Sequence, residues 1–188
     1  MIERLCAFDF DSTLIRTYEP DEGIRMWEDY YGVKYPHKGN GWWSKPESLD
    51  TKVFDISPNE SVLNQLNFEL SQPNTHVILL TSRIFKLRPE VEKILELNNI
   101  YVDEIDMKKS EEDKGVRILK YLDKYPNIHT INVYDDRDVE IDVFKKLKRK
   151  IPVDISFNIY KVTDGKISLT ESIVDIVLDE IKKISIYL

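Results

Sequence analysis

Hydrophobic and polar positions follow two different periods along the chain, and these periods predict its strands and helices. From residue 76 onward, short apolar runs alternate with amphipathic stretches, as parallel α/β sheets require. With a first strand that starts near Arg4, the predicted strands are His76–Leu80, Ile100–Glu104, His129–Tyr134 and Asp154–Tyr160. The predicted helices between and after them are Pro89–Leu97, Glu111–Lys124, Asp138–Lys148 and Glu171–Ile184. The pattern predicts an α/β fold with a central, mainly parallel sheet.

The regular pattern fails between the first two strands. Residues 15–74 are rich in aromatic residues, proline and glycine, and we expect an insertion with helices of its own. One helix is predicted after Asp21 and another after Ser57. The chain therefore reads as one domain, 1–188, in which residues 15–74 form a cap-like or substrate-specificity insertion.

Composition narrows the functional classes. The chain has 188 residues, of which 41% are hydrophobic and 32% are charged, which is typical of a globular protein. A formal net charge of −7 argues against an extended basic surface for nucleic acid, although a local groove for a phosphate end remains compatible with it. A single cysteine, Cys6, and the lack of a long apolar stretch predict a soluble, cytoplasmic protein without membrane contact. The oligomeric state is left open.

Candidate chemistry lies where the predicted strands end. In an open parallel sheet, ligands bind at the carboxyl ends of the strands, so residues at those positions matter most. The first strand ends at Asp9 and Asp11, two carboxylates that point to the same side. Such paired acids favour a hard cation such as Mg²⁺, although an Asp-x-Asp pair is also common where a strand merely turns. Later strands and helices add Thr81-Ser82-Arg83, Lys114 and Asp135-Asp136-Arg137.

Together and in this order, these residues resemble the four motifs of the haloacid dehalogenase (HAD) superfamily of phosphotransferases and phosphatases. The corresponding positions are Asp9-Phe10-Asp11-Ser12-Thr13, Thr81, Lys114 and Asp135-Asp136. The resemblance implies a three-layer, Rossmann-like fold. Further segments are similar to the Swiss Army Knife RNA-repair-like subgroup and, more distantly, to the phosphatase half of polynucleotide kinase-phosphatases. They are Phe8–Leu14, Arg16–Pro20, Gly41-Trp42-Trp43 and Asp135-Asp136-Arg137, with Tyr18 where the subgroup has proline.

The resemblance implies a mechanism and a metal. Asp9 is the expected nucleophile, which forms an aspartyl-phosphate, and Asp11 is the expected proton carrier. Mg²⁺ is expected on the Asp9 carboxylate, the Asp11 carbonyl and Asp136, with Asp135 as a ligand or close neighbour. Thr81, Ser82 and Lys114 are expected to bind the phosphate.

Four further residues have two interpretations each. Arg83 and Arg137 are predicted either to clamp substrate phosphate or to pair with the neighbouring acids. Trp42 and Trp43 are predicted either to stack on a base or to pack the insertion against the core.

The substrate is less defined than the chemistry. The leading hypothesis is a Mg²⁺-dependent phosphomonoester hydrolase, with nucleic-acid ends in RNA or DNA repair as the preferred substrate class. The alternatives are a small-metabolite or nucleotide phosphatase, a protein phosphatase, and a binding or scaffold protein on an inactive HAD fold.

Overall fold

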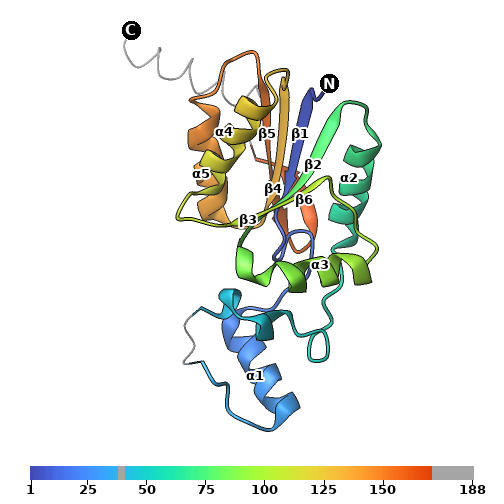
Figure 1. The fold of residues 1–188 in the computed structure, drawn as a ribbon, viewed down its shortest axis with the longest axis vertical. Coiled ribbons are helices and arrows are strands. Elements are labelled where there is room, and N and C mark those ends of the chain that lie inside the picture. The colour runs from blue at the N-terminus through green and yellow to red at the C-terminus, as the bar shows by residue number, and fades with distance from the viewer. Residues whose placement is uncertain (38–40, 171–188) are drawn as a thin grey trace.

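The computed structural model describes residues 1–37 and 41–170, and it is built around a six-stranded sheet (Figure 1). The strand order is β3-β2-β1-β4-β5-β6. The strands are β1 Arg4–Phe8, β2 Thr75–Ile84, β3 Glu104–Lys108, β4 Thr130–Asp135, β5 Ser156–Thr163 and β6 Lys166–Leu169. All neighbours pair in parallel except β5 and β6. Because β1 is central and followed by β2 on one side and β4 on the other, its carboxyl end lies at the switch point of the sheet.

The two faces of this sheet are covered by α2 Glu60–Ser71, α3 Arg88–Leu97, α4 Lys114–Lys124 and α5 Asp138–Lys148. Helix α1, Pro20–Tyr31, does not cover the sheet. Three short 3₁₀ helices lie at Trp42–Ser44 (η1), Pro46–Leu49 (η2) and Phe85–Leu87 (η3). In Figure 1, α4 and α5 lie on one side of the sheet and α2 and α3 on the other. Among the described residues, no helix combines the length and the apolar character that a membrane crossing needs.

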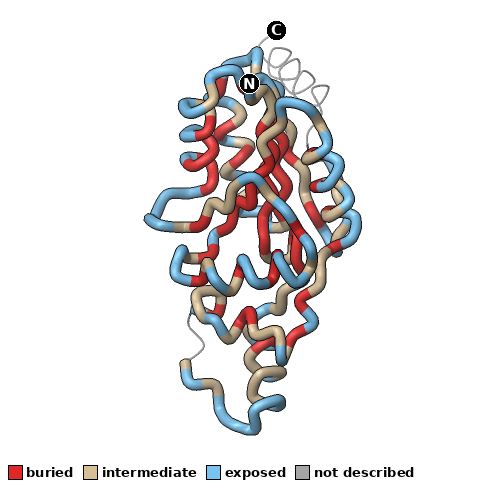
Figure 2. The backbone as a smooth tube through the Cα atoms, turned by 45° about the vertical axis from the view of Figure 1, so that its right-hand side comes forward, coloured by how far each residue is buried: buried red, intermediate tan, exposed pale blue. Residues whose placement is uncertain are grey.

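The alternation of side chains along β1 explains the two-sided core. Leu5 and Ala7 point to the α4 and α5 side, whereas Cys6 and Phe8 point to the α2 and α3 side. Figure 2 shows the buried residues concentrated in the strands and on the inner sides of the helices. On the second face, the ring of Phe8 stacks on Tyr134 at 4.2 Å, and Tyr134 stacks on Tyr160 at 4.6 Å. These rings tie β1, β4 and β5 together directly below the carboxyl edge.

Residues 15–58, which we call the cap segment, connect β1 to α2 across the carboxyl edge of the sheet. Its helix α1 lies at the lower end of Figure 1, away from the sheet. The ring of Trp42 packs so closely on Gly23 of α1 that a Cβ atom there would lie 2.3 Å from it. Helix α2 falls within the expected insertion, residues 15–74, but it packs against the sheet like the other helices through buried Val62 and Leu66.

The predicted element types are confirmed for the described residues, with differences in detail. Strand β2 runs to Ile84, four residues beyond the predicted end, so Thr81, Ser82 and Arg83 lie within the strand. The third strand was predicted four residues early, because apolar Ile100 and Val102 belong to the turn after α3 while the edge strand β3 is largely polar. Helix α4 begins at Lys114 rather than Glu111, because Asp113 caps it. Strand β6 was not predicted. The predicted helix 171–184 lies outside the described residues.

Candidate active site

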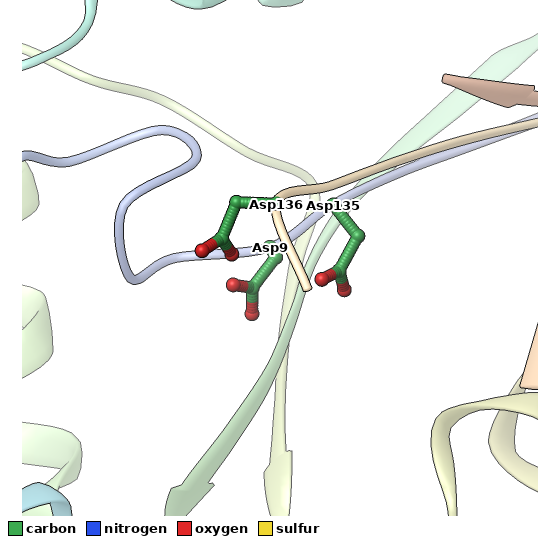
Figure 3. A group of neighbouring side chains, drawn as sticks. All are labelled: Asp9, Asp135 and Asp136. Atoms are coloured by element: carbon green, nitrogen blue, oxygen red, sulfur yellow. The ribbon is translucent and has the colours of Figure 1, made fainter. Parts of the chain in front are cut away.

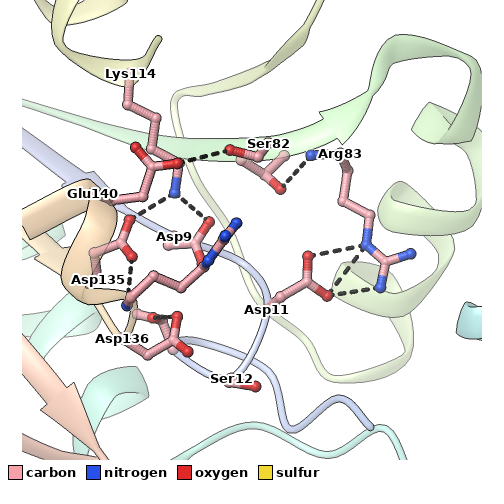
Figure 4. Close-up of polar contacts among 12 residues, drawn as sticks. Asp9, Asp11, Ser12, Ser82, Arg83, Lys114, Asp135, Asp136 and Glu140 are labelled. Atoms are coloured by element: carbon pink, nitrogen blue, oxygen red, sulfur yellow. Dashed lines mark hydrogen bonds and ion pairs between the residues drawn. The ribbon is translucent and has the colours of Figure 1, made fainter. Parts of the chain in front are cut away.

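A cavity of about 310 Å³ opens at the carboxyl edge of the sheet, between the strand ends and the cap segment. Figure 4 shows the polar contacts of several residues at this site. Its walls are formed by Asp9, Asp11, Ser12, Glu19, Trp43, Ser82, Arg83, Lys114, Asp136 and Arg137. The sequence motifs, which lie up to 128 residues apart in the chain, therefore meet at one place as the parallel topology requires.

The loop after β1 is held in an unusual conformation. Ser12 has a φ of 54°, in the left-handed region that residues with a Cβ rarely adopt. The side-chain amide of Asn59 stabilises this turn by donating to the carbonyl oxygens of Ser12 (3.1 Å) and Thr13 (2.6 Å). The Thr13 hydroxyl in turn donates to Asp136 at 3.3 Å. The start of α2 and the end of β4 thus fix the loop that carries the first two acids.

Asp9 and Lys114 form a buried ion pair at the floor of the cavity. The Lys114 ammonium donates to Asp9 at 2.7 Å and to Asp135 at 2.6 Å, as Figure 4 shows. Asp113 fixes the lysine's position because it caps α4 by accepting from the Val116 amide at 2.8 Å. Burial alone would lower the pKa of Lys114, but the carboxylates of Asp135 and Asp9 raise it above its usual value. The two carboxylates therefore favour the charged form of the lysine beside Asp9.

Three carboxylates, those of Asp9, Asp135 and Asp136, gather at the ends of β1 and β4 (Figure 3). One oxygen from each lies within 4.8 Å of the others. Burial raises the pKa of Asp9 well above its usual value, with Lys114 opposing and Asp135 adding to the rise. Burial and the neighbouring Asp135 likewise raise the pKa of Asp136 to about 6. Such a cluster of hard oxygen donors fits a divalent cation, which would relieve the repulsion.

The two members of the last acid pair differ in their contacts. Asp135 is 1% exposed, and its oxygens accept from Lys114 and from the backbone amide of Arg137 (3.0 Å). Asp136 lines the cavity, and its carboxylate accepts only from Thr13 among the contacts of the described residues. Asp136 is thus the more available ligand of the two.

Asp11 is held by Arg83 rather than by Lys114. Nε and Nη2 of Arg83 donate to its two carboxylate oxygens at 2.7 to 3.2 Å, which is a bidentate arrangement (Figure 4). The Arg83 side chain is fully buried. Of its two predicted roles, pairing with an acid is the one present here.

The end of β2 presents Ser82 rather than Thr81 to the cavity. The buried Thr81 hydroxyl accepts from the backbone amide of Arg83 at 3.1 Å, so it shapes the strand end. Ser82 is exposed, lines the cavity and donates to Glu140 of α5 at 3.3 Å. Arg117 supports the same strand end by donating to the Thr81 carbonyl at 2.9 Å.

The two adjacent tryptophans point to different environments. Trp42 is 1% exposed and its indole donates to the Tyr18 carbonyl at 2.9 Å, so it packs the cap segment and does not reach the cavity. Trp43 is half-buried and lines the cavity, where the Arg83 guanidinium lies 5.2 Å from its ring. Arg137 is exposed and also lines the cavity. Stacking on a substrate therefore concerns Trp43 alone.

Sequence reasoning missed several residues that build the site. Asn59 was predicted only as part of a helix start, Glu19 only as part of the Arg16–Pro20 segment, and Ser48 was not predicted. Asn59 and Ser48 act from loops, through contacts 35 to 47 residues away in sequence, and no periodic pattern marks such contacts.

The architecture and its carboxyl-edge acids define a class, the HAD hydrolase fold. Three solved structures of this fold are similar to the chain. A haloacid dehalogenase-like hydrolase from Streptococcus pneumoniae has a TM-score of 0.51 at 14% identity, over 94% of this chain and 90% of that one. The HAD domain of the effector Lem4 from Legionella pneumophila has a TM-score of 0.51 at 12% identity, over 96% of this chain and 94% of that one. The Pnkp1/Rnl/Hen1 complex matches with a TM-score of 0.51 at 17% identity, over 83% of this chain and 44% of that one.

The particular family follows from the sequence. Residues 31–185 match the model of HAD domain family 1 in Swiss Army Knife RNA repair proteins, and the chain belongs to this family. The matched range begins after Asp9 and Asp11, whose assignment rests on their geometry. A curated relative, the uncharacterized protein YMR265C of Saccharomyces cerevisiae, is 27% identical over 168 residues, which is 77% of this chain. The chain spans about a third of that relative's length, since the match covers 36% of it.

Proposed function

We propose that the chain is a Mg²⁺-dependent phosphomonoester hydrolase that acts through an aspartyl-phosphate on Asp9. One observation carries this proposal. The Asp9 carboxylate lies at the end of the central strand, accepts from the Lys114 ammonium at 2.7 Å, and lines one cavity with Asp11 and Asp136. A nucleophile, a proton carrier and a metal-ligand pair are thereby within reach of one phosphoryl group.

The residues divide the reaction into two steps. An Asp9 oxygen attacks phosphorus, the bond from phosphorus to the leaving oxygen breaks, and Asp11 gives its proton to that oxygen. In the second step, water attacks phosphorus, Asp11 takes the proton of that water, and the bond to Asp9 breaks to release phosphate. Lys114 stabilises negative charge at Asp9 and on the transferring group throughout. Ser82 is positioned to donate to a phosphate oxygen, and Thr81 keeps it at the cavity wall.

The metal would be held by Asp9, Asp136 and the main-chain carbonyl of Asp11. Asp135 would act through Lys114, because its oxygens are already engaged by that lysine and by the Arg137 amide. When bound, Mg²⁺ neutralises charge on the phosphoryl group and on the acids around it. Such oxygen-rich sites suit Mg²⁺, which prefers carboxylates together with substrate phosphate.

Nucleic-acid ends are the substrate class that we favour. The family description refers to RNA repair proteins, which supports this choice. The half-buried ring of Trp43 and the exposed guanidinium of Arg137 lie at the cavity wall, where they suit a base and a neighbouring phosphate.

The test is a substrate panel measured with Mg²⁺ and with EDTA. We would compare oligonucleotides with a 3′-phosphate, oligonucleotides with a 5′-phosphate, mononucleotides, sugar phosphates and a phosphopeptide. We expect Mg²⁺-dependent release of phosphate, abolished in Asp9→Asn, with kcat/KM highest for one of the two oligonucleotide ends.

Different outcomes refute different parts of the proposal. Wild-type turnover by Asp9→Asn would exclude Asp9 as the nucleophile. Equal kcat/KM for mononucleotides and oligonucleotides would leave the hydrolase assignment and remove the preference for nucleic-acid ends. Mg²⁺ binding without turnover of any phosphomonoester would favour a binding protein on an inactive HAD fold.

A further inference from the structure

Arg83 links the proton carrier Asp11 to the cap segment. Two of its nitrogens bind the Asp11 carboxylate, and the third, Nη1, donates to the Ser48 hydroxyl at 2.5 Å and to the Trp43 carbonyl at 3.1 Å. All three guanidinium nitrogens of this fully buried side chain therefore have partners. Because guanidinium is planar, the contacts at Nη1 also fix the plane in which the other two nitrogens meet Asp11.

Ser48 is built to accept this hydrogen bond. The residue is 2% exposed, and its hydroxyl hydrogen is donated to the Lys45 carbonyl at 2.7 Å. The remaining lone pairs of its oxygen are thus directed to Arg83. Its backbone amide also donates to the Lys45 carbonyl, within the short helix η2 that begins at Pro46. These local hydrogen bonds therefore hold Ser48 in position independently of Arg83.

We infer that Ser48 is a positioning residue for catalysis, which orients Asp11 through Arg83. Proton transfer depends on the donor's alignment with the leaving oxygen, and a poorly oriented carboxyl group loses most of its catalytic contribution. The cap segment then shapes the chemical step as well as the cavity wall. This inference rests on the proposed hydrolase function, with Asp11 as its proton carrier.

The leaving group provides a selective readout. p-Nitrophenolate is a weak base that departs without a proton, whereas an alkoxide must be protonated as its bond to phosphorus breaks. A defect in Asp11 orientation therefore slows the first step far more with 2-phenylethyl phosphate than with p-nitrophenyl phosphate. A general loss of structure slows both equally, since the same folded fraction acts on both substrates.

The experiment measures kcat/KM on both substrates for the wild type and Ser48→Ala, because kcat/KM reports only the first step, whereas the second step uses Asp11 with both substrates. For Ser48→Ala we expect roughly a tenfold loss with 2-phenylethyl phosphate and less than about a twofold loss with p-nitrophenyl phosphate. Ser48→Thr, which keeps the hydroxyl, should recover most of the selectivity. Ser44→Ala is the matched control, because its hydroxyl donates to the Gly41 carbonyl in the same segment. It should change neither rate.

A second measurement isolates the path through Asp11. Ser48→Ala should have no further effect in the Asp11→Asn background, because the carboxyl group it orients is no longer there. Equal losses on both substrates, or additive losses in the double variant, would overturn the inference. The proposed function is judged separately: it stands if the wild type hydrolyses p-nitrophenyl phosphate and Asp9→Asn does not. If the wild type hydrolyses neither substrate, both fail.

Discussion

Replacement of Lys114 by methionine tests the electrostatic account of the site through stability rather than through activity. The side chains of Lys114, Asp9 and Asp135 are 2%, 5% and 1% exposed, and the ammonium lies 2.7 and 2.6 Å from the two carboxylates. Methionine keeps the length and the apolar stem but leaves two buried carboxylates without a cation. Because breaking a buried ion pair from one side costs about 3–5 kcal/mol, we expect the unfolding free energy to fall by that amount at pH 7.5.

The assay is urea unfolding in EDTA, followed by tryptophan fluorescence. The matched control is Lys120 in the same helix, α4. It pairs with Glu112 at 2.5 Å but is 59% exposed. Lys120→Met should leave the unfolding free energy unchanged within error, because solvent screens that pair. In the Asp9→Asn background, Lys114→Met should cost less than in the wild type, since one unpaired carboxylate has been removed. Equal effects of Lys114→Met and Lys120→Met would refute the reasoning.

Three further predictions concern the tryptophans, the acids and the surface beside the site. Trp42→Ala should lower the unfolding free energy by about 3–5 kcal/mol, whereas Trp43→Ala should mainly raise KM for oligonucleotides. In EDTA, Asp136→Asn should raise Tm more at pH 7.5 than at pH 5, because a carboxyl whose native pKa is raised to about 6 stabilises in full only below its unfolded pKa and loses that contribution as pH rises through about 6. Exposed Lys86 and Lys109 follow β2 and β3 at the edge that carries the site, so their joint replacement by glutamate should raise KM for long oligonucleotides.

Each of these predictions has a control and a contradicting result. For the lysines, the control is the same charge change at Lys146 and Lys150, which lie in the last turn of α5 and just beyond it, away from the carboxyl edge. If both double variants raise KM for long oligonucleotides equally, the change in net charge explains the rise, and not contact of the oligonucleotide with Lys86 and Lys109. For Asp136, saturating Mg²⁺ should remove the pH trend, and a trend that persists would contradict the assignment. A Trp43→Ala variant as unstable as Trp42→Ala would show that both rings pack the core.

The location of the site was predictable because a parallel sheet converts sequence order into spatial proximity. Once Asp9, Lys114 and Asp136 were placed after strands or at a helix start, the topology brought them to one edge without further information. Loop contacts have no such rule. Asn59 and Ser48 reach the site through single hydrogen bonds from irregular segments, and their position depends on how the whole cap segment packs.

A missed strand and an alternative that the sequence left open had different physical origins. Strand β6 follows a turn at Asp164-Gly165, where both residues have positive φ values of 49° and 71°. An Asp-Gly pair is a strong hairpin signal, so this strand was predictable and the signal was overlooked. No comparable sequence signal shows that Trp42 is buried whereas Trp43 lines the cavity. They are adjacent and chemically identical, and tertiary contacts of Trp42, with Gly23 and with the Tyr18 carbonyl, separate them.

The packing of the cap segment also bears on how a substrate enters. Trp42, Leu49, Phe54 and Ile56 are at most 7% exposed and belong to the same core as Phe8. Burial of each such side chain contributes about 1.5–3 kcal/mol, so lifting this segment would cost roughly 6–12 kcal/mol. That is comparable to the whole stability of a typical domain, about 5–15 kcal/mol, so the lifted form would make up less than about one molecule in 10,000. The described part of the cap segment is therefore a wall of the cavity in almost every molecule.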